Sequence, residues 1–108
     1  MHFSTIVRFH NTDSKESIGF GRGIVQLLRG VKEYGSLNKA TKAMGMAYSK
    51  AWRILNETED EFGIKLLDRD GAHGSYLTPE CEKLLEIYDE MLAASNEAVG
   101  KVFNKYFK

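Results

Sequence analysis

Lys and Arg residues are concentrated in one part of this sequence. Residues 29–53 contain six of them and a single acidic residue, which gives this stretch a net charge of +5. Guanidinium and ammonium groups bind phosphate oxygens, and both can also reach the acceptor atoms of guanine in the major groove. The clustering therefore indicates that this stretch contributes a nucleic-acid-binding surface.

Residue types that carry out catalysis or bind metals are scattered instead. The three histidines, His2, His10 and His73, share no metal-binding spacing, and the sequence offers no nucleophile with an adjacent base. The glycine-rich residues 19–23 have neither the spacing of a dinucleotide fingerprint nor the Gly-Lys-Ser/Thr ending of a P-loop. Cys81 is the only cysteine, so we interpret it as a structural thiol. We therefore predict no enzyme, no metal site and no cofactor.

Length and composition are typical of one globular domain. The chain has 108 residues, of which 43% are hydrophobic and 28% charged, and this excludes a wholly disordered chain. No apolar run approaches the roughly 20 residues that span a bilayer, and the first ten residues do not resemble a secretory signal. We therefore expect a cytoplasmic protein that makes no membrane contact.

The overall charge of zero does not exclude a nucleic-acid partner. Fifteen Lys and Arg residues balance fifteen Asp and Glu residues, but the acidic ones gather in residues 57–61 and 79–90. A polyanion responds to the field within a Debye length of about 8 to 10 Å, so local charge matters more than the total. The acidic residues 57–61 are predicted to form a solvated helix end that faces away from a polyanion, rather than a metal site.

Helical spacing predicts three helices around the basic stretch. Apolar residues recur at helical intervals over residues 21–34, and Ser36 is suited to cap a second helix that Gly45 ends. A third helix is predicted to begin near Tyr48 and to end at Gly63. Two helices joined by a short glycine-containing turn are typical of a helix-turn-helix.

Two hairpins and a long helix complete the predicted fold. Alternating residues predict an N-terminal hairpin with strands at residues 2–10 and 16–20, and a second hairpin at residues 64–69 and 75–77, whose loop would form a wing. Thr78 and Pro79 begin a helix that extends to residue 108, although Gly100 is expected to let its last turns fray. The prediction is one compact, mainly α domain with a small amount of β structure: residues 1–20 form the hairpin, 21–78 the winged helix-turn-helix and 79–108 the long dimerisation helix.

The long helix carries a heptad seam. Its apolar and small residues recur from Cys81 to Tyr106 at alternating spacings of four and three, the pattern by which two helices pack as a coiled coil. A second copy of the chain is the natural partner. The predicted homodimer interface comprises Leu85, Tyr88, Leu92, Val99 and Val102.

The helix-turn-helix prediction assigns roles to the cations. The second helix of such a motif lies in the major groove, and the first helix crosses the phosphates. We predict that Tyr48, Ser49, Lys50 and Arg53 face bases, that Asn38, Lys39 and Lys42 contact phosphates, and that Arg69 and His73 of the wing also reach DNA. The alternative for the four cations of the two helices is an ordinary solvated face, and Tyr48 could equally lie at the rim of the core.

Several segments resemble the N-terminal winged helix-turn-helix domain of ModE-type molybdate-responsive regulators, and the layout is similar to the wider LysR-type domain. The resemblance covers about residues 20–88 and rests on Gly35-Ser36-Leu37-Asn38-Lys39-Ala40, Met44-Gly45-Met46-Ala47-Tyr48, Ala51-Trp52 and Leu77-Thr78-Pro79. It implies a sequence-specific transcriptional regulator that binds double-stranded DNA as a homodimer at a pseudo-palindromic operator.

The sequence also departs from that family pattern. Ala47 stands where the family usually has serine, and the wing is reduced to residues 70–74. Together with the zero net charge, these departures leave open a protein-interaction module that has lost DNA binding. Because the sequence ends at Lys108 without a molybdate-binding module, we expect no molybdate binding.

Overall fold

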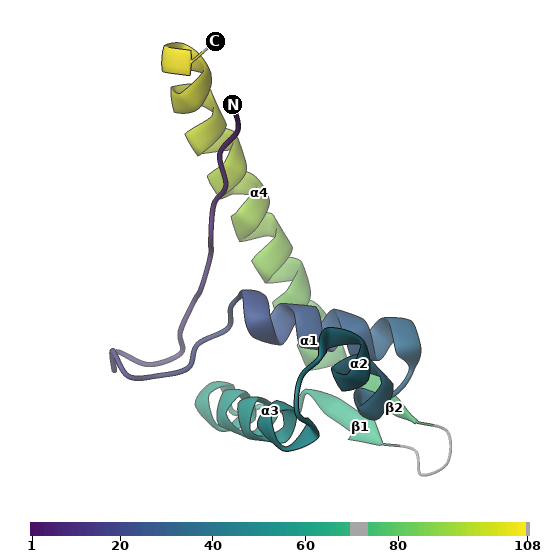
Figure 1. Ribbon diagram of the computed structural model, residues 1–108. Coiled ribbons are helices and arrows are strands. Elements are labelled where there is room, and N and C mark those ends of the chain that lie inside the picture. Colours follow the sequence, from purple (N-terminus) through teal and green to yellow (C-terminus); the bar gives the residue numbers. More distant parts are fainter. Residues whose placement is uncertain (70–73, 108) are drawn as a thin grey trace.

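The computed structural model describes residues 1–69 and 74–107 and contains, within them, four helices and one two-stranded sheet (Figure 1). The elements follow in the order α1 (Arg22–Tyr34), α2 (Leu37–Met44), α3 (Tyr48–Phe62), β1 (Leu67–Arg69), β2 (Ser75–Leu77) and α4 (Pro79–Phe107). The two strands pair antiparallel, with Asp68 opposite Tyr76. The predicted architecture, mainly helical with a winged helix-turn-helix and a long C-terminal helix, is confirmed.

Local sequence signals set the ends of the helices. The Ser36 hydroxyl accepts a hydrogen bond from the Lys39 N–H at 3.3 Å and so caps α2. Gly45 ends α2 with a φ of 67°, a left-handed conformation that side chains with a Cβ disfavour. At the start of α4, the Thr78 hydroxyl accepts from the Cys81 N–H at 3.1 Å and donates to the Lys65 carbonyl. These caps are the ones that the sequence predicts.

Helix α1 lies at the centre of the core. Its residues Leu27, Leu28 and Val31 are fully buried. The other helices each turn an apolar face towards it, comprising Leu37 and Ala40 from α2, Ala51 and Leu55 from α3, and Cys81, Leu85 and Tyr88 from α4. Burial, together with the nearby carboxylates of Glu82 and Glu59, raises the pKa of the Cys81 thiol to about 12, as expected for a structural cysteine.

The two halves of α4 have different surroundings. The buried residues Leu85 and Tyr88 lie in the first half and are only 6% and 4% exposed within their own chain. Both were predicted to face a second copy, but the core of the same chain already covers them, so any seam for a partner begins at Leu92. The outer half of α4, residues 92–107, stands away from the body, and the molecule is 53 Å long (Figure 1). No helix within the described residues is long and apolar enough to cross a membrane.

The N-terminal hairpin is reduced to a single bridge. Phe9 and Phe20 exchange two backbone hydrogen bonds of 3.1 and 2.7 Å, and no strand forms on either side within the described residues. In the connecting loop, the hydroxyls of Thr12 and Ser14 accept hydrogen bonds from the N–H groups of Ser14 and Glu16. Because these side chains offer the backbone local partners, they compete with a strand ladder.

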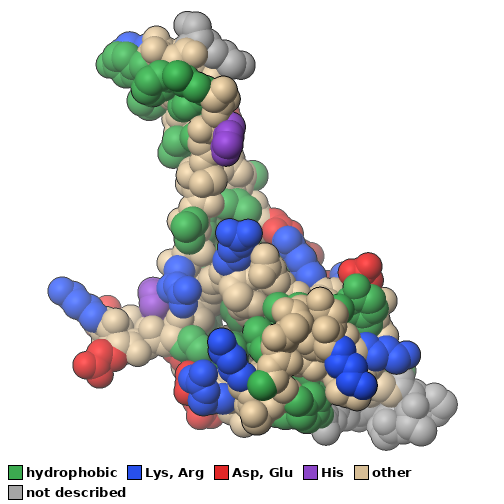
Figure 2. Space-filling model, in the orientation of Figure 1, with side chains coloured by type: hydrophobic (Ala, Val, Ile, Leu, Met, Phe, Trp, Pro, Cys, Tyr) green, Lys and Arg blue, Asp and Glu red, His purple; other side chains and the backbone are tan. Residues whose placement is uncertain are grey.

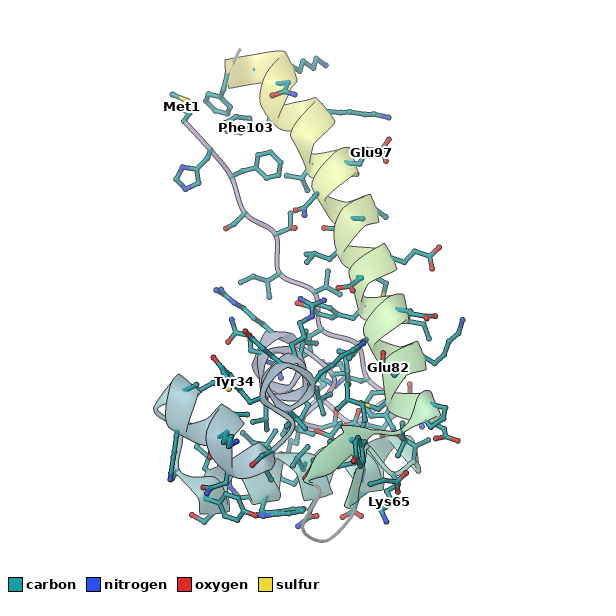
Figure 3. The ribbon with its side chains drawn as sticks, turned by 90° about the vertical axis from the view of Figure 1, so that its right-hand side faces the viewer. Met1, Tyr34, Lys65, Glu82, Glu97 and Phe103 are labelled. Carbon is teal, nitrogen blue, oxygen red and sulfur yellow. The ribbon has the colours of Figure 1, made fainter. Side chains whose placement is uncertain are left out.

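Residues 1–9 form an extended segment, the N-terminal strap, that runs beside the outer half of α4 (Figure 3). The Phe3 ring lies 5.2 Å from the Phe103 ring, and the Thr5 hydroxyl donates to the side-chain oxygen of Asn96. Phe3 also approaches Gly100, where an added Cβ would lie 3.3 Å from the ring. The predicted fraying at Gly100 is wrong, because α4 continues to Phe107 and the glycine gives the ring of Phe3 room to pack.

The first strand of the wing is shorter than predicted. It begins at Leu67 rather than at residue 64. The reason is a long-range partner: the Leu66 N–H donates to the Glu59 carboxylate at 2.7 Å instead of joining a ladder. Leu66 itself is fully buried and belongs to the core between α3 and the wing.

Candidate nucleic-acid interface

The start of α3 presents its polar side chains to solvent. Tyr48, Ser49, Lys50 and Arg53 are all exposed there. On the opposite side of the helix, Ala51, Leu55 and Thr58 are buried, and this fixes the rotation of α3 about its axis. Ala47 provides no side-chain acceptor at the helix start, so the first-turn N–H groups have no side-chain cap. The four residues predicted to face bases therefore lie at the exposed start of one helix.

Tyr48 and Trp52 pack against each other at the side of this surface. Their rings meet edge to face, with centroids 6.1 Å apart. Trp52 also packs against the core, whereas Tyr48 remains 42% exposed. Trp52 thus packs between Tyr48 and the core. Tyr48 therefore lies at the rim of the core, with its ring packed edge to face against Trp52.

Helix α2 brings a second set of polar residues to the same region. Asn38, Lys39 and Lys42 are exposed, whereas Leu37, Ala40 and Thr41 face the core. The buried Thr41 hydroxyl donates to the Asn38 carbonyl at 2.9 Å, so this polar residue inside the motif has a partner. In the view of Figure 2, Lys and Arg side chains lie over α2 and α3, and others lie over the rest of the body.

Ion pairs divide the basic stretch into two parts. Arg29 pairs with Asp89, and Lys32 pairs with Glu82 at 3.0 Å, so the two cations that α1 contributes to this stretch are matched by acids of α4. By contrast, Lys39, Lys42 and Lys50 form no ion pair with any residue that the structure describes. The uncompensated charge of residues 29–53 therefore lies on α2 and the start of α3.

Arg53 is the exception among the predicted base-facing cations. Its guanidinium lies 3.5 Å from the Glu57 carboxylate, one turn later on α3, and both side chains are about half exposed. Exposed pairs of this kind contribute only about 0.3 to 0.5 kcal/mol. A phosphate or a guanine edge can therefore replace Glu57 as the partner of Arg53.

The base of the wing is fixed to the turn between α1 and α2. The Ser75 N–H donates to the Gly35 carbonyl at 3.0 Å, and an added Cβ at Gly74 would lie only 2.2 Å from that oxygen. Arg69 lies in β1 beside this junction. His73, the other wing residue predicted to reach DNA, lies outside the described residues. The wing thus starts from a defined point next to the helix-turn-helix.

Sequence reasoning missed two structural carboxylates at the end of α3. Glu59 accepts the Leu66 N–H, as described above, and Glu61 accepts the N–H groups of Asn11 and Gly19, each at 2.9 Å. The prediction of a merely solvated acidic end is therefore wrong for these two residues. Their partners lie between 7 and 50 positions away in sequence, so no local pattern could have identified them.

Comparisons with known proteins agree with this geometry. Residues 24–82 match the family described as bacterial regulatory helix-turn-helix protein, lysR family. The chain is 27% identical over 78 residues to a transcriptional regulator ModE of Yersinia pestis, an alignment that covers 68% of this chain and 30% of that protein. It is 33% identical over 69 residues to a transcriptional regulator ModE of Haemophilus influenzae, covering 60% and 27% respectively. The chain thus spans less than a third of the length of these relatives.

A solved structure shares the fold. The crystal structure titled CbnR_DBD-DNA complex aligns with a TM-score of 0.60 and 20% sequence identity, and the alignment covers 77% of this chain and 94% of the other. At this level of identity the likeness concerns the arrangement of the helices and the small sheet.

Proposed function

The chain belongs to the lysR family of bacterial regulatory helix-turn-helix proteins, and on this basis we propose that it is a sequence-specific transcriptional regulator that binds double-stranded DNA as a homodimer. The family is a class of DNA-binding regulators and not of enzymes. The operator would be pseudo-palindromic, with the two recognition helices separated by about one helical turn, 34 to 36 Å. We expect such a regulator to act in the cytoplasm.

One observation carries this proposal. Lys39, Lys42 and Lys50 are exposed on adjacent helices and have no ion-pair partner among the described residues, although the chain as a whole is neutral. An unpaired basic surface on an otherwise balanced protein is what a phosphate backbone would neutralise.

The positions on the two helices suggest separate roles. Tyr48, Ser49, Lys50 and Arg53 would reach base edges from the first turns of α3, with Arg53 exchanging Glu57 for a guanine. Asn38, Lys39 and Lys42 on α2 would hold the phosphates and set the register. Arg69 and His73 would extend the contact through the wing.

The homodimer would form through the outer half of α4. Beyond the core, Val99, Val102 and Tyr106 recur on one side of the helix and are 40%, 59% and 68% exposed. Leu92, which is half-buried, connects this strip to the body. A helix that leaves such residues in water gains from packing against a second copy. Of the five residues predicted for the interface, Leu92, Val99 and Val102 remain proposed.

Affinity capture of sheared genomic DNA by the purified protein, followed by sequencing, tests the regulatory function. Salt of about 0.15 M suppresses most nonspecific phosphate binding. We expect a few enriched fragments that share an inverted repeat. Uniform recovery, or none, would contradict sequence-specific binding.

Sedimentation of the protein with Val102→Asp tests the dimer. A carboxylate in the proposed seam should shift the protein from dimer to monomer, because its burial would be unfavourable. Asn104→Asp introduces the same charge at an exposed position on the other side of the helix and should leave the dimer unchanged. A dimer that persists in the Val102 variant would place the interface elsewhere.

Ala47 supports a second candidate, a protein-interaction module on the same scaffold. It leaves the start of α3 without a side-chain cap, so the helix that should read DNA lacks one anchoring hydroxyl. This candidate predicts no DNA binding even at low salt, and a stable complex with a different protein through α4. The capture experiment separates it from the regulator.

A further inference from the structure

A pocket lies where the N-terminal strap, α1 and α4 meet, away from the proposed DNA surface. Its volume is about 330 Å³. This is near the lower end for small-molecule sites, which usually measure about 300 to 1,000 Å³. The strap contributes Ser4 and Thr5, and the other lining residues come from one side of α1 and from the junction between the two halves of α4. None of the described residues that line this pocket is part of the proposed DNA surface.

Part of the lining is apolar. Val25 of α1 is 2% exposed, and Leu92 of α4 is half-buried. Both line the pocket beside the ring of Tyr88. These three side chains provide a surface against which a small apolar group could pack.

The Tyr88 hydroxyl is an unused polar group at this site. Tyr88 is 4% exposed, and its hydroxyl forms no hydrogen bond with any residue that the structure describes. No fully buried side-chain polar atom in the described residues lacks a partner, so this hydroxyl is accessible to solvent. A tyrosine that is almost wholly buried, that lines a pocket and that retains an accessible hydroxyl can donate a hydrogen bond to a bound molecule.

Two guanidinium groups line the pocket, and one of them, that of Arg22, makes it positive. Arg22 and Arg29 lie on the same side of α1, with the amide of Gln26 between them. Arg29 pairs with Asp89, whereas Arg22 forms no ion pair with any described residue. None of the described residues that line the pocket is an Asp or a Glu. The donors therefore outnumber the acceptors, and the charge favours an anion.

We propose that this pocket binds a small organic carboxylate, with its apolar body between Val25 and Leu92 and its carboxylate held by Arg22 and the Tyr88 hydroxyl. Planar carboxylates accept two parallel hydrogen bonds from a guanidinium, which matches the chemistry of Arg22. The Ser4 hydroxyl and the Gln26 amide are further donors in the lining. The proposal concerns the protein without DNA and holds whether or not DNA binding is confirmed.

Titration of the labelled full chain with benzoate, followed by NMR, tests this proposal. Benzoate joins a carboxylate to a flat apolar ring that the volume accommodates. We expect saturable shifts that cluster on the strap, on residues 22–29 and around Tyr88. Sodium chloride at matched ionic strength should not reproduce them. Two results would overturn the proposal. One is a titration that does not saturate by about 10 mM benzoate, which would mean a negligible affinity, and the other is a set of shifts confined to α2 and α3.

Two variants sharpen the test. Tyr88→Phe keeps the ring in the core and removes only the hydroxyl, so benzoate should bind several-fold more weakly while the fold is retained. Arg22→Gln should weaken binding about tenfold, the factor expected for one charge-assisted hydrogen bond. Arg53→Gln on α3 makes the same charge change away from the pocket and should bind benzoate normally. Equal affinities in all four proteins would overturn the assignment.

A third variant is expected to bind benzoate more tightly rather than more weakly. A disturbed fold would not produce such a gain, so this variant tests the proposal even if the first two are unstable. Asp89→Asn releases Arg29 from its partner and should strengthen benzoate binding a few-fold. Weaker or unchanged binding would exclude Arg29 and its charge from the site. Inorganic phosphate lacks the apolar body, so phosphate that binds as tightly as benzoate would overturn the assignment of an organic carboxylate.

Discussion

The body of the molecule and the outer half of α4 are stabilised differently. In the body, α1 is surrounded by the other helices, and fully buried Leu27 and Leu28 lie at its centre. Among the described residues, only the N-terminal strap lies beside the outer half of α4, and Val102 and Tyr106 are more than half exposed. The body can fold with what its own sequence supplies. The outer half of α4 retains an apolar strip that its own chain does not cover.

The largest expected loss of stability comes from a substitution in the body, and comparing it with a substitution in the outer half of α4 separates the two regions. Leu28→Ala removes a fully buried side chain from the body and should lower the free energy of unfolding by about 2 to 5 kcal/mol. Val102→Ala shortens an exposed side chain and should change the free energy of unfolding of the monomer by less than about 0.5 kcal/mol. Urea unfolding at low protein concentration measures both. Similar losses would show that the outer half of α4 is part of the folded core.

A substitution at the wing junction should cause the next largest loss of stability. Gly74→Ala adds a Cβ that would lie 2.2 Å from the Gly35 oxygen, at a φ of 98° that favours glycine. We expect a loss of about 1 to 3 kcal/mol in thermal or urea unfolding. Gly23→Ala in α1 is the matched control, because nothing lies within 4 Å of its added Cβ and alanine favours helix. A Gly74 variant as stable as the control would mean that the junction adjusts freely.

Glu61 links the body to the loop that follows the strap, and this link should depend on pH. Burial alone would raise the pKa of Glu61, but hydrogen bonds from the Asn11 and Gly19 N–H groups, with help from His10 and Ser17, lower it from its ordinary value of 4.5. Because the folded-state pKa is the lower one, this stabilisation is present above about pH 4.5 and is lost as the pH falls through the folded-state pKa.

Glu61→Gln removes the charged acceptor and should lower stability at pH 7 by about 1 to 2 kcal/mol. The variant should also lose less stability than the wild type between about pH 5 and pH 3, since it has no carboxylate to protonate. Asp60→Asn makes the same charge change at an exposed neighbour and should follow the wild-type pH profile. Urea midpoints across this range measure the difference. Parallel profiles for wild type and Glu61→Gln would contradict the link.

The smallest effect should come from Gly100. Gly100→Ala favours the helical conformation by up to about 1 kcal/mol, but its Cβ would lie 3.3 Å from the Phe3 ring. We expect the two effects nearly to cancel in overall stability, and the strap to loosen. Hydrogen exchange of residues 2–8 should then become faster while that of α4 slows. An unchanged strap would mean that Phe3 does not need the space at Gly100.

The same contrast explains what the sequence could predict. Helix ends depend on near neighbours, so Ser36, Gly45 and Thr78 marked them correctly. The exposed cations of α2 and α3 also follow from helical spacing, because the apolar residues between them must face the core. These local signals were sufficient for the architecture and for the candidate DNA surface.

Contacts between distant segments were beyond the reach of local patterns. A heptad seam cannot distinguish the core of the same chain from a partner helix, so Leu85 and Tyr88 were assigned to a dimer although the core of their own chain covers them. Similarly, Lys32 counted towards the basic stretch, but its charge is matched by Glu82 of α4 at 3.0 Å. The hairpin failed for the same reason, since the strap packs beside α4 rather than against its own return segment.

The central claim is that DNA binds the unpaired cations of α2 and α3 and not the paired cations of α4. Fluorescence anisotropy on a captured operator, at about 0.15 M salt, tests this with two double variants of equal charge change. Lys42→Ala with Lys50→Ala should weaken binding at least about tenfold. Lys83→Ala with Lys101→Ala, whose lysines pair with Glu86 and Glu97 on α4, should bind within about twofold of the wild type. Equal losses in both double variants, or none in the first, would contradict the claim.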